Sequence, residues 1–284
     1  MEQEKYKIGF FKRIKWAIFN LENYDLFAVE SAKKAILYFI RIMLLFTCLI
    51  CIGITYQFGQ TFYRTLDLLE ESMPNFTFQD GKLIAEETAE ILSEEIGVVL
   101  VDTTQEASKK EENLEKIRGY TAGILLLDDK LALKVPNVEG IIIYDYADLI
   151  AQYHLQDFTK QEAIDYIHSL NKVSLYMAFY VAAFMYLFSI YVVVTLMDIF
   201  LLSILGVLTA KLVKIKLRYT PIINLCIYAL TLPIALNAAY ILINSFTGFE
   251  IEYFQVMYNA IAYIYVVAAI LMIKSEMIKQ EQEL

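Results

Sequence analysis

Four apolar runs, each long enough to cross a lipid bilayer, constrain the fold of this chain more than any other feature. They lie at residues 35–57, 173–208, 219–246 and 254–273. A helix rises about 1.5 Å per residue and the hydrocarbon core of a bilayer is about 30 Å thick, so about 20 apolar residues make one crossing. Hydrophobic residues are 58% of the chain, above the ~45–50% of soluble domains. The sequence therefore predicts a membrane α-helical protein with four transmembrane helices.

The first run, residues 35–57, predicts a retained helix rather than a cleaved signal peptide. Residues 1–34 precede it, and no cleavage site of small residues follows it. The run is also longer than the ~7–15 apolar residues of a signal peptide. We therefore expect it to remain as a membrane anchor.

The second run, residues 173–208, would be about 54 Å long as one straight helix, well beyond the hydrocarbon core. Either one helix continues past the lipid, or the run breaks near Asp198. The loop 209–218 that follows contains only basic charges, at Lys211, Lys214, Lys216 and Arg218. An extra crossing would place these cations outside, against the positive-inside rule. The sequence favours one long helix.

The distribution of charge predicts the orientation of the chain. Residues 1–34 contain seven Lys/Arg and five acids, and the loop between the last two runs contains Glu250 and Glu252 but no Lys or Arg. Cytoplasmic loops of membrane proteins are enriched in Lys and Arg. We therefore expect the cell membrane as the location, with residues 1–34 and the tail 274–284 in the cytoplasm and residues 58–172 outside it.

The segment 58–172 is expected to fold as an inserted, acidic extracytoplasmic α+β domain. Residues 57–172 contain ten basic and 22 acidic residues, a net charge of −12, which disfavours nucleic acid as a partner. Asp80-Gly81 separates two short apolar runs and is typical of a hairpin turn. The expected strands are 76–78, 83–84, 98–101, 124–127, 131–135 and 140–144. The expected helices are 85–95 and one that begins with the capping box Thr159 to Glu162.

The segment before the first run is amphipathic. Its apolar positions repeat at helical spacing at Phe10, Phe11, Ile14, Ile18 and Leu21, and the basic residues Lys12, Arg13 and Lys15 flank them. This pattern predicts an interfacial helix on the inner leaflet, with Trp16 at the depth of the lipid headgroups. A helix packed on the cytoplasmic ends of the spans needs the same pattern and remains the alternative.

Two charged residues lie within the apolar runs. Arg41 is in the first run and Asp198 is in the second, both toward the cytoplasmic ends. Because a charge inside lipid is costly, such residues usually face protein or water. We expect an interhelical ion pair between Arg41 and Asp198, or else an arginine that snorkels to the headgroups and an aspartate at the water boundary.

The third run contains amides at several depths together with a proline inside the helix. The residues are Asn224, Asn237, Asn244 and Pro233. Proline removes a helical hydrogen bond, which predicts a kinked span. The amides are expected either to hydrogen-bond neighbouring helices or to line a path for a solute.

None of the common catalytic motifs occurs in the sequence. HExxH, GxSxG, the P-loop and GxGxxG are all missing, His154 and His168 have no Cys partners in the acidic segment, and Cys48, Cys51 and Cys226 all lie in apolar runs. We therefore expect no enzymatic activity, no cofactor and no metal site.

Several short motifs resemble one known family. They are the N-terminal Phe/Lys segment ending in Tyr24, Met73-Pro74-Asn75-Phe76, Asp80-Gly81-Lys82-Leu83, the strand 99–104, Asp128-Asp129-Lys130, residues 144–149 and residues 217–219 through 228–233. Their order resembles the bacterial membrane family catalogued as domain of unknown function 1189, some of whose members are labelled maltodextrin-utilisation proteins. The spans alone are also similar to the membrane core of the Yip1-like families. The resemblance implies a location and a context, and it supplies no catalytic residues.

These features together predict a non-enzymatic accessory or scaffolding protein in carbohydrate uptake or envelope maintenance. The expected partners are the lipid bilayer and another membrane protein such as a sugar permease. Two alternatives stay open. One is a small-solute transporter or channel that uses the third span, and the other is a saccharide sensor with stacking faces at Tyr120, Tyr144, Tyr146 and Tyr153.

Overall fold

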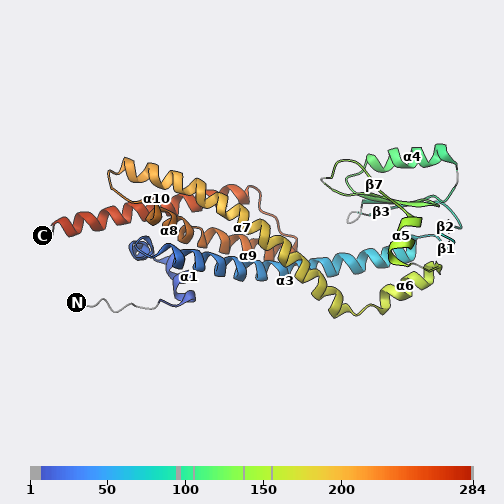
Figure 1. Ribbon diagram of the computed structural model, residues 1–284, viewed down its shortest axis with the longest axis horizontal. Coiled ribbons are helices and arrows are strands. Elements are labelled where there is room, and N and C mark those ends of the chain that lie inside the picture. Colours follow the sequence, from blue (N-terminus) through green and yellow to red (C-terminus); the bar gives the residue numbers. More distant parts are fainter. Residues whose placement is uncertain (1–7, 94–96, 105, 137, 155, 283–284) are drawn as a thin grey trace. The chain divides into compact units, whose positions relative to one another are not determined.

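The chain forms two compact units, shown in Figure 1. The computed structural model describes residues 8–93, 97–104, 106–136, 138–154 and 156–282. The helical unit consists of residues 1–57 and 176–284, and the α+β unit consists of residues 58–175. The inserted domain expected at residues 58–172 lies close to these bounds.

Four helices are long and apolar enough to cross a membrane. Two of them, α3 (Ala32–Ser72) and α7 (Lys172–Leu212), have 41 residues each and contribute residues to both units. The third is divided into α8 (Tyr219–Ala229) and α9 (Thr231–Thr247), and the fourth is α10 (Phe254–Gln282). Helix α7 runs through Asp198 without a break, as the charges after it indicated.

The interruption of the third span at Leu230 has a local cause. Pro233 has no backbone N–H, so the carbonyl of Ala229, four residues earlier, loses its helical donor, and the proline ring crowds that carbonyl. Leu230 still donates to the Cys226 carbonyl and accepts from the Ile234 N–H, both within 3.1 Å. α8 and α9 therefore meet at Leu230, where these two backbone hydrogen bonds continue the helical pattern on either side of the lost one.

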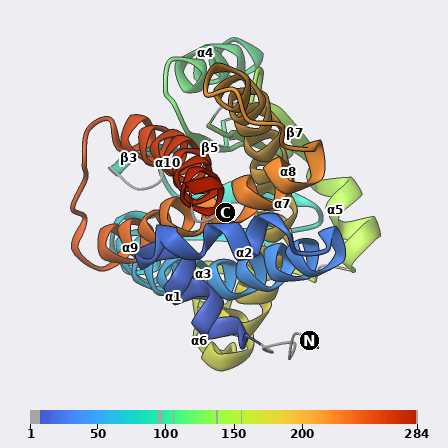
Figure 2. The ribbon, with the colours of Figure 1, turned by 90° about the vertical axis from the view of Figure 1, so that its left-hand side faces the viewer.

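The N-terminal segment is built into the helical unit. It consists of α1 (Phe10–Phe19), the 3₁₀ turn η1 (Leu21–Asn23) and α2 (Tyr24–Ala28). Figure 2 shows these elements beside α3, α8 and α9. Ala17, Tyr24 and Phe27 belong to the same buried core as residues of α8 and α10. Of the two arrangements that the amphipathic pattern allowed, the structure has the one in which the segment packs on the spans.

A five-stranded sheet forms the centre of the α+β unit. Its strands, in spatial order, are β3 (Ala89–Ser93), β4 (Gly97–Val101), β5 (Gly123–Leu126), β6 (Lys130–Lys134) and β7 (Ile142–Asp145). β4 and β5 are parallel, and the other neighbours are antiparallel. Helix α4 (Ala107–Arg118) makes the crossover that a parallel pair requires.

Each face of this sheet is covered. On one face Ile117 of α4 packs against Val98, Leu100 and Leu125. On the other, Ile91, Val99 and Val101 pack against Leu68 and Leu69 of α3. A smaller sheet of β2 (Lys82–Ala85), β1 (Phe76–Gln79) and β8 (Phe158–Thr159) also covers that face, together with α5 (Tyr146–Tyr153). Helix α6 (Lys160–Ser169) follows β8.

Several local predictions for the α+β unit are confirmed. Asp80 and Gly81 have φ values of 50° and 77°, and they form the turn of the β1–β2 hairpin, as expected for an Asp-Gly turn in which both residues are left-handed. Thr159 and Glu162 form the predicted capping box at the start of α6. The strands expected at 98–101, 124–127, 131–135 and 140–144 correspond to β4, β5, β6 and β7, within about two residues.

The helix expected at 85–95 is wrong, since residues 89–93 form strand β3; residues 94–96 lie outside the described part. Ala and Glu in this stretch favour a helix in isolation. Pairing with β4 prevails, because it buries Ile91 against Val99 while the side chains on either side of Ile91 face outward. Helices α4 and α5 were not predicted.

Gly97 and Gly140 allow a test of how tightly β4 is held. Both have positive φ, 78° and 87°, but a Cβ on Gly97 would lie 2.0 Å from the Ala122 carbonyl oxygen, whereas a Cβ on Gly140 meets nothing within 4 Å. We expect Gly140→Ala to cost about 1 kcal/mol for left-handed strain alone. Gly97→Ala should cost clearly more and increase hydrogen exchange in β4 and β5 of the full-length protein. Equal exchange in the two variants would contradict this packing.

Candidate functional site

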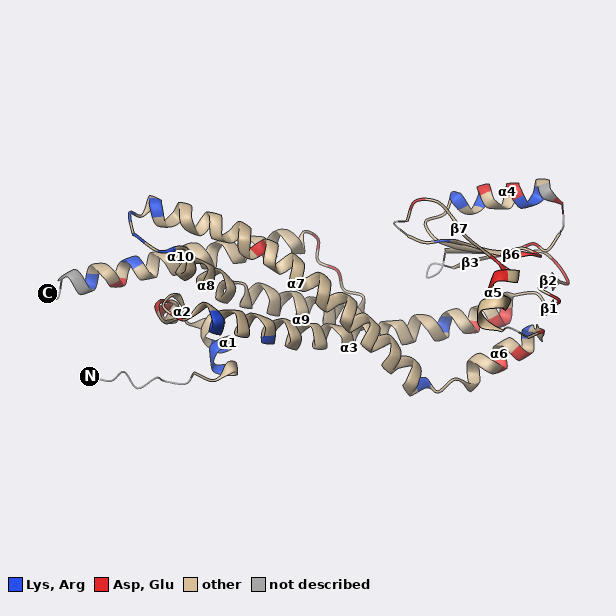
Figure 3. Ribbon diagram, in the orientation of Figure 1, with Lys and Arg blue, Asp and Glu red and all other residues tan. Residues whose placement is uncertain are grey.

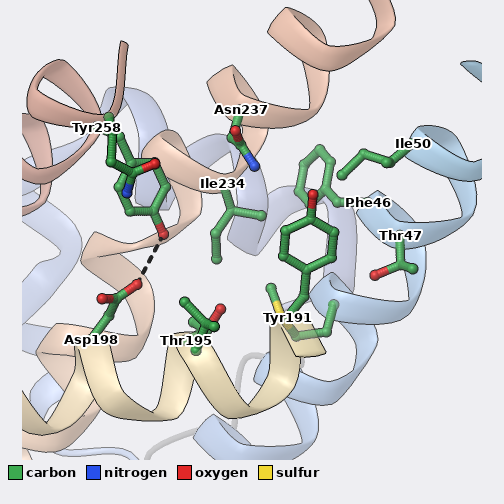
Figure 4. Close-up of a pocket in the computed structure, with 12 residues that line it drawn as sticks. Phe46, Thr47, Ile50, Tyr191, Thr195, Asp198, Ile234, Asn237 and Tyr258 are labelled. Carbon is green, nitrogen blue, oxygen red and sulfur yellow. Dashed lines mark hydrogen bonds between the residues drawn. The ribbon is translucent and has the colours of Figure 1, made fainter. Parts of the chain in front are cut away.

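Helices α3, α7, α9 and α10 surround a cavity of about 80 Å³ in the helical unit, shown in Figure 4. Its wall combines apolar side chains with hydroxyl, amide and carboxylate groups. The lining residues are Met43, Phe46, Thr47, Ile50, Tyr191, Val194, Thr195, Asp198, Ile234, Asn237, Gln255 and Tyr258. Polar groups of this number are unusual inside apolar spans and mark the cavity as the candidate site.

Asp198 is the charged group of the cavity. It is half-buried on α7, and its Oδ2 accepts a hydrogen bond of 3.4 Å from the Tyr258 hydroxyl of α10, drawn as the dashed line in Figure 4. Thr195 precedes Asp198 by three residues, so the two side chains share one face of α7. Thr195 is only 4% exposed. The carboxylate and a buried hydroxyl therefore lie together on one wall.

Neutral polar groups complete the cavity. Thr47 of α3 is 2% exposed, and Figure 4 shows it across the cavity from Asp198. The Tyr191 hydroxyl lies close to the Asn237 amide of α9. Gln255 adds a second amide from α10. Each of the four helices thus contributes at least one oxygen-bearing side chain.

A second cavity adjoins the same carboxylate. It measures about 90 Å³, and Asp198 and Tyr258 line it together with Leu202, Leu230 and Asn259. Leu230 is the residue at which the third span is interrupted. Asp198 and Tyr258 consequently line both cavities.

The structure does not form the expected ion pair between Arg41 and Asp198. Arg41 is exposed on α3, while its neighbours Ile42 and Met43 are buried, and Met43 lines the cavity. A helix turns by about 100° per residue, so Arg41 lies about 200° around α3 from Met43. Its side chain therefore leaves the bundle, and Asp198 accepts a hydrogen bond from Tyr258 instead.

The three amides of the third span have three different surroundings. Asn237 lines the cavity. Asn224 is fully buried, and its Nδ2 donates to the carbonyls of Phe27, at 3.3 Å, and Glu30, at 2.8 Å. Asn244 donates to the Phe249 carbonyl at 3.1 Å, just after α9 ends. Asn224 therefore serves helix packing, and Asn244 serves the end of α9. Asn237 is the one of the three amides that faces the cavity.

Arg13 forms an ion pair inside the protein. Its guanidinium donates to both carboxylate oxygens of Glu30 at 2.6 Å, and the Tyr228 hydroxyl lies 2.6 Å from Arg13 and 2.7 Å from Glu30. The hydrogen bond to Glu30 raises the pKa of Arg13. Burial opposes ionisation of Glu30, but the hydrogen bonds from Arg13 and Tyr228 outweigh it and lower the pKa of that carboxyl. This triad joins the N-terminal segment to α8.

The other expected anchor residues differ from Arg13. Lys15 is exposed, and the Lys12 Nζ lies 4.8 Å from the centre of the Trp16 ring, which is itself half-buried. Nothing in the local pattern distinguished Arg13 from these neighbours. Its partners lie 17 and 215 residues away along the chain, beyond the reach of a helical pattern.

Two carboxylates of the α+β unit, Asp102 and Asp128, are engaged in contacts within that unit. Asp102, after β4, accepts hydrogen bonds from Thr104 and from the Asn113 Nδ2 of α4 at 2.6–3.0 Å. Burial acts against its ionisation, yet these bonds lower the pKa of Asp102. Asp128, in the β5–β6 turn, pairs with Lys110 of α4. Within the described residues, no group of three or more His, Cys, Asp and Glu could hold a metal ion.

Strand β7 presents apolar side chains at the edge of the five-stranded sheet. It pairs with β6 on one side and is last in the strand order. Ile142, Ile143 and Tyr144 are 38%, 49% and 42% exposed. Of the tyrosines considered for stacking on a saccharide, Tyr146 is buried against Phe78, whereas Tyr144 and Tyr153 are exposed.

The triad predicts a specific stability effect. Arg13→Met leaves the Glu30 carboxylate in a part-buried site without its cation, which should cost about 3 kcal/mol. Lys15→Met, on the same helix but exposed, should cost less than about 0.5 kcal/mol. Thermal unfolding in detergent and hydrogen exchange over residues 10–28 measure both. Equal protection of that segment in the two variants would contradict the role of the triad.

A family model described as "Protein of unknown function (DUF1189)" matches residues 11–270, which is nearly the whole chain. The match confirms the resemblance to that family indicated by the short motifs. It gives no information on maltodextrin utilisation or on the Yip1-like families. No curated protein and no solved structure matches the chain.

Proposed function

The chain belongs to the DUF1189 family, and from that premise we propose that it is a non-enzymatic multi-pass membrane protein that anchors its α+β unit outside the cytoplasm for a partner protein. The partner would act in carbohydrate uptake or in maintenance of the cell envelope. In this proposal the helical unit crosses the cell membrane four times and both termini are cytoplasmic.

The orientation is supported by charge. Lys214, Lys216 and Arg218 lie in the connection between α7 and α8, and Glu250 and Glu252 lie between α9 and α10. Figure 3 shows the basic residues at one end of the helical unit and these acids at the other. The positive-inside rule then assigns the basic end to the cytoplasm. Because α3 and α7 lead from the acidic end into residues 58–175, the α+β unit would be outside.

The observation that carries the partner role is the edge strand β7. An exposed edge offers unpaired backbone groups, and proteins usually protect such edges with charged residues. The opposite edge, β3, carries Glu90, which pairs with Lys116. β7 ends in Asp145, which pairs with Lys130, but the three residues before it, Ile142, Ile143 and Tyr144, are apolar or aromatic and all exposed. Addition of a partner strand with apolar side chains would satisfy the backbone and cover these residues.

Substitution on β7 tests the partner role. Ile143→Lys places a charge on this edge and should reduce recovery of the partner at least tenfold, since charge on an edge strand opposes strand addition. Leu92→Lys is the matched control, because Leu92 is an exposed residue of the opposite edge strand, 64% exposed. Tagged variants are purified in mild detergent from cells grown on maltodextrin or on glucose, and partners are quantified by mass spectrometry.

The outcomes distinguish a role in carbohydrate uptake from a role in envelope maintenance. Sugar-permease subunits enriched on maltodextrin and lost with Ile143→Lys support a role in uptake. Envelope proteins enriched equally on both sugars and lost with Ile143→Lys support a role in maintenance. Recovery that is unchanged by Ile143→Lys, or reduced equally by Leu92→Lys, rejects β7 as the docking edge.

Passage of a small solute is a second candidate function, and the polar cavity favours it. The cavity of about 80 Å³ is lined by hydroxyl, amide and carboxylate groups from four helices, and groups of this kind suit an ion or a small polar solute. Flux of a small solute into liposomes that is lost on Asn237→Leu would support this function.

A further inference from the structure

Asp198 requires a counter-charge that its protein surroundings do not supply. It belongs to an apolar helix long enough to span a membrane, where an ionised carboxylate is costly unless it is paired. Its hydrogen-bond donor in the described part of the chain is the neutral hydroxyl of Tyr258. Arg41, the basic residue expected beside it, is exposed on α3. Either a proton or a bound cation must therefore neutralise Asp198.

The surroundings of Asp198 suit a cation. Thr47 and Thr195 are 2% and 4% exposed, so their hydroxyl oxygens face the protein interior. Asn237 and Gln255 add amide oxygens to the same cavity. Hard cations are bound by oxygen atoms of this kind that replace their water of hydration. A cavity meant only for a neutral, protonated aspartate would need no such number of oxygens.

The charge of the site indicates a monovalent ion. Asp198 is the carboxylate among the residues that line the two cavities, and divalent cations are usually held by more than one acidic ligand.

We propose that the cavity between α3, α7, α9 and α10 binds one small monovalent cation. The Asp198 carboxylate is the charged ligand, and the hydroxyl of Thr195, on the same face of α7, is a neutral ligand. Thr47, Asn237 and Gln255 line the rest of the cavity. This site is independent of the partner role proposed for β7.

The experiment compares the thermal unfolding of the full-length protein in detergent at constant pH and ionic strength in sodium, potassium and choline chloride. Ligand binding to the folded state stabilises it by RT ln(1 + [L]/Kd), so the unfolding temperature keeps rising with the cation concentration above Kd. We expect sodium or potassium to raise the unfolding temperature relative to choline, by an increment that grows with the cation concentration. Asp198→Asn should abolish this difference, and Asp67→Asn, at an exposed carboxylate of the α+β unit, should preserve it.

A second variant and a direct measurement keep the test decisive if Asp198→Asn does not fold. Thr195→Val removes one neutral ligand and should raise the half-saturating cation concentration by about tenfold. Equilibrium dialysis of the wild-type protein with radioactive sodium should give one bound ion per chain when sodium is the stabilising ion.

Three results would overturn the proposal. The first is equal unfolding temperatures in sodium, potassium and choline. The second is a response to pH with no response to the cation, which would identify a proton as the occupant. The third is a cation response that persists in Asp198→Asn, which would place the ion elsewhere in the chain.

Discussion

Polar groups that lie within apolar spans must find partners inside the protein, and this constraint determines how the helical unit is arranged. In a bilayer, apolar side chains gain little by moving from lipid to a helix interface, so packing and interhelical hydrogen bonds hold apolar helices together. Asn224 on α8 donates to two carbonyls of the N-terminal segment. The Tyr38 and Thr231 hydroxyls, on α3 and α9, lie 2.9 Å apart. These hydrogen bonds join helices whose apolar surfaces alone would not hold them together.

The same constraint explains why the N-terminal segment is part of the bundle. Tyr228 is fully buried, and its ring stacks on Phe27 with centroids 3.8 Å apart. Its hydroxyl would have no partner there without Arg13 and Glu30. The segment therefore provides both the apolar cover and the hydrogen bonds that α8 requires.

Elements determined by local chemistry could be predicted from the sequence, and elements determined by distant partners could not. The lengths of the apolar runs predicted the four long apolar helices, and Pro233 predicted the interruption of the third one. The Asp80-Gly81 pair predicted the turn of the first hairpin. Strand β3 was not predicted because its Ala and Glu residues favour a helix in isolation. They form a strand because β4 pairs with them. In the cavity, the sequence drew attention to Asp198 and Asn237, but Tyr258, Thr195 and Thr47 give no signal without the fold.

The orientation of the α+β unit is the claim on which the proposed function rests, and cysteine labelling tests it most directly. In a variant that lacks Cys48, Cys51 and Cys226, one new cysteine replaces either Glu139 or Lys216, which are both exposed. A maleimide that cannot cross membranes should label Glu139→Cys in intact cells and Lys216→Cys only after permeabilisation. The reverse pattern would place the α+β unit in the cytoplasm and contradict the account.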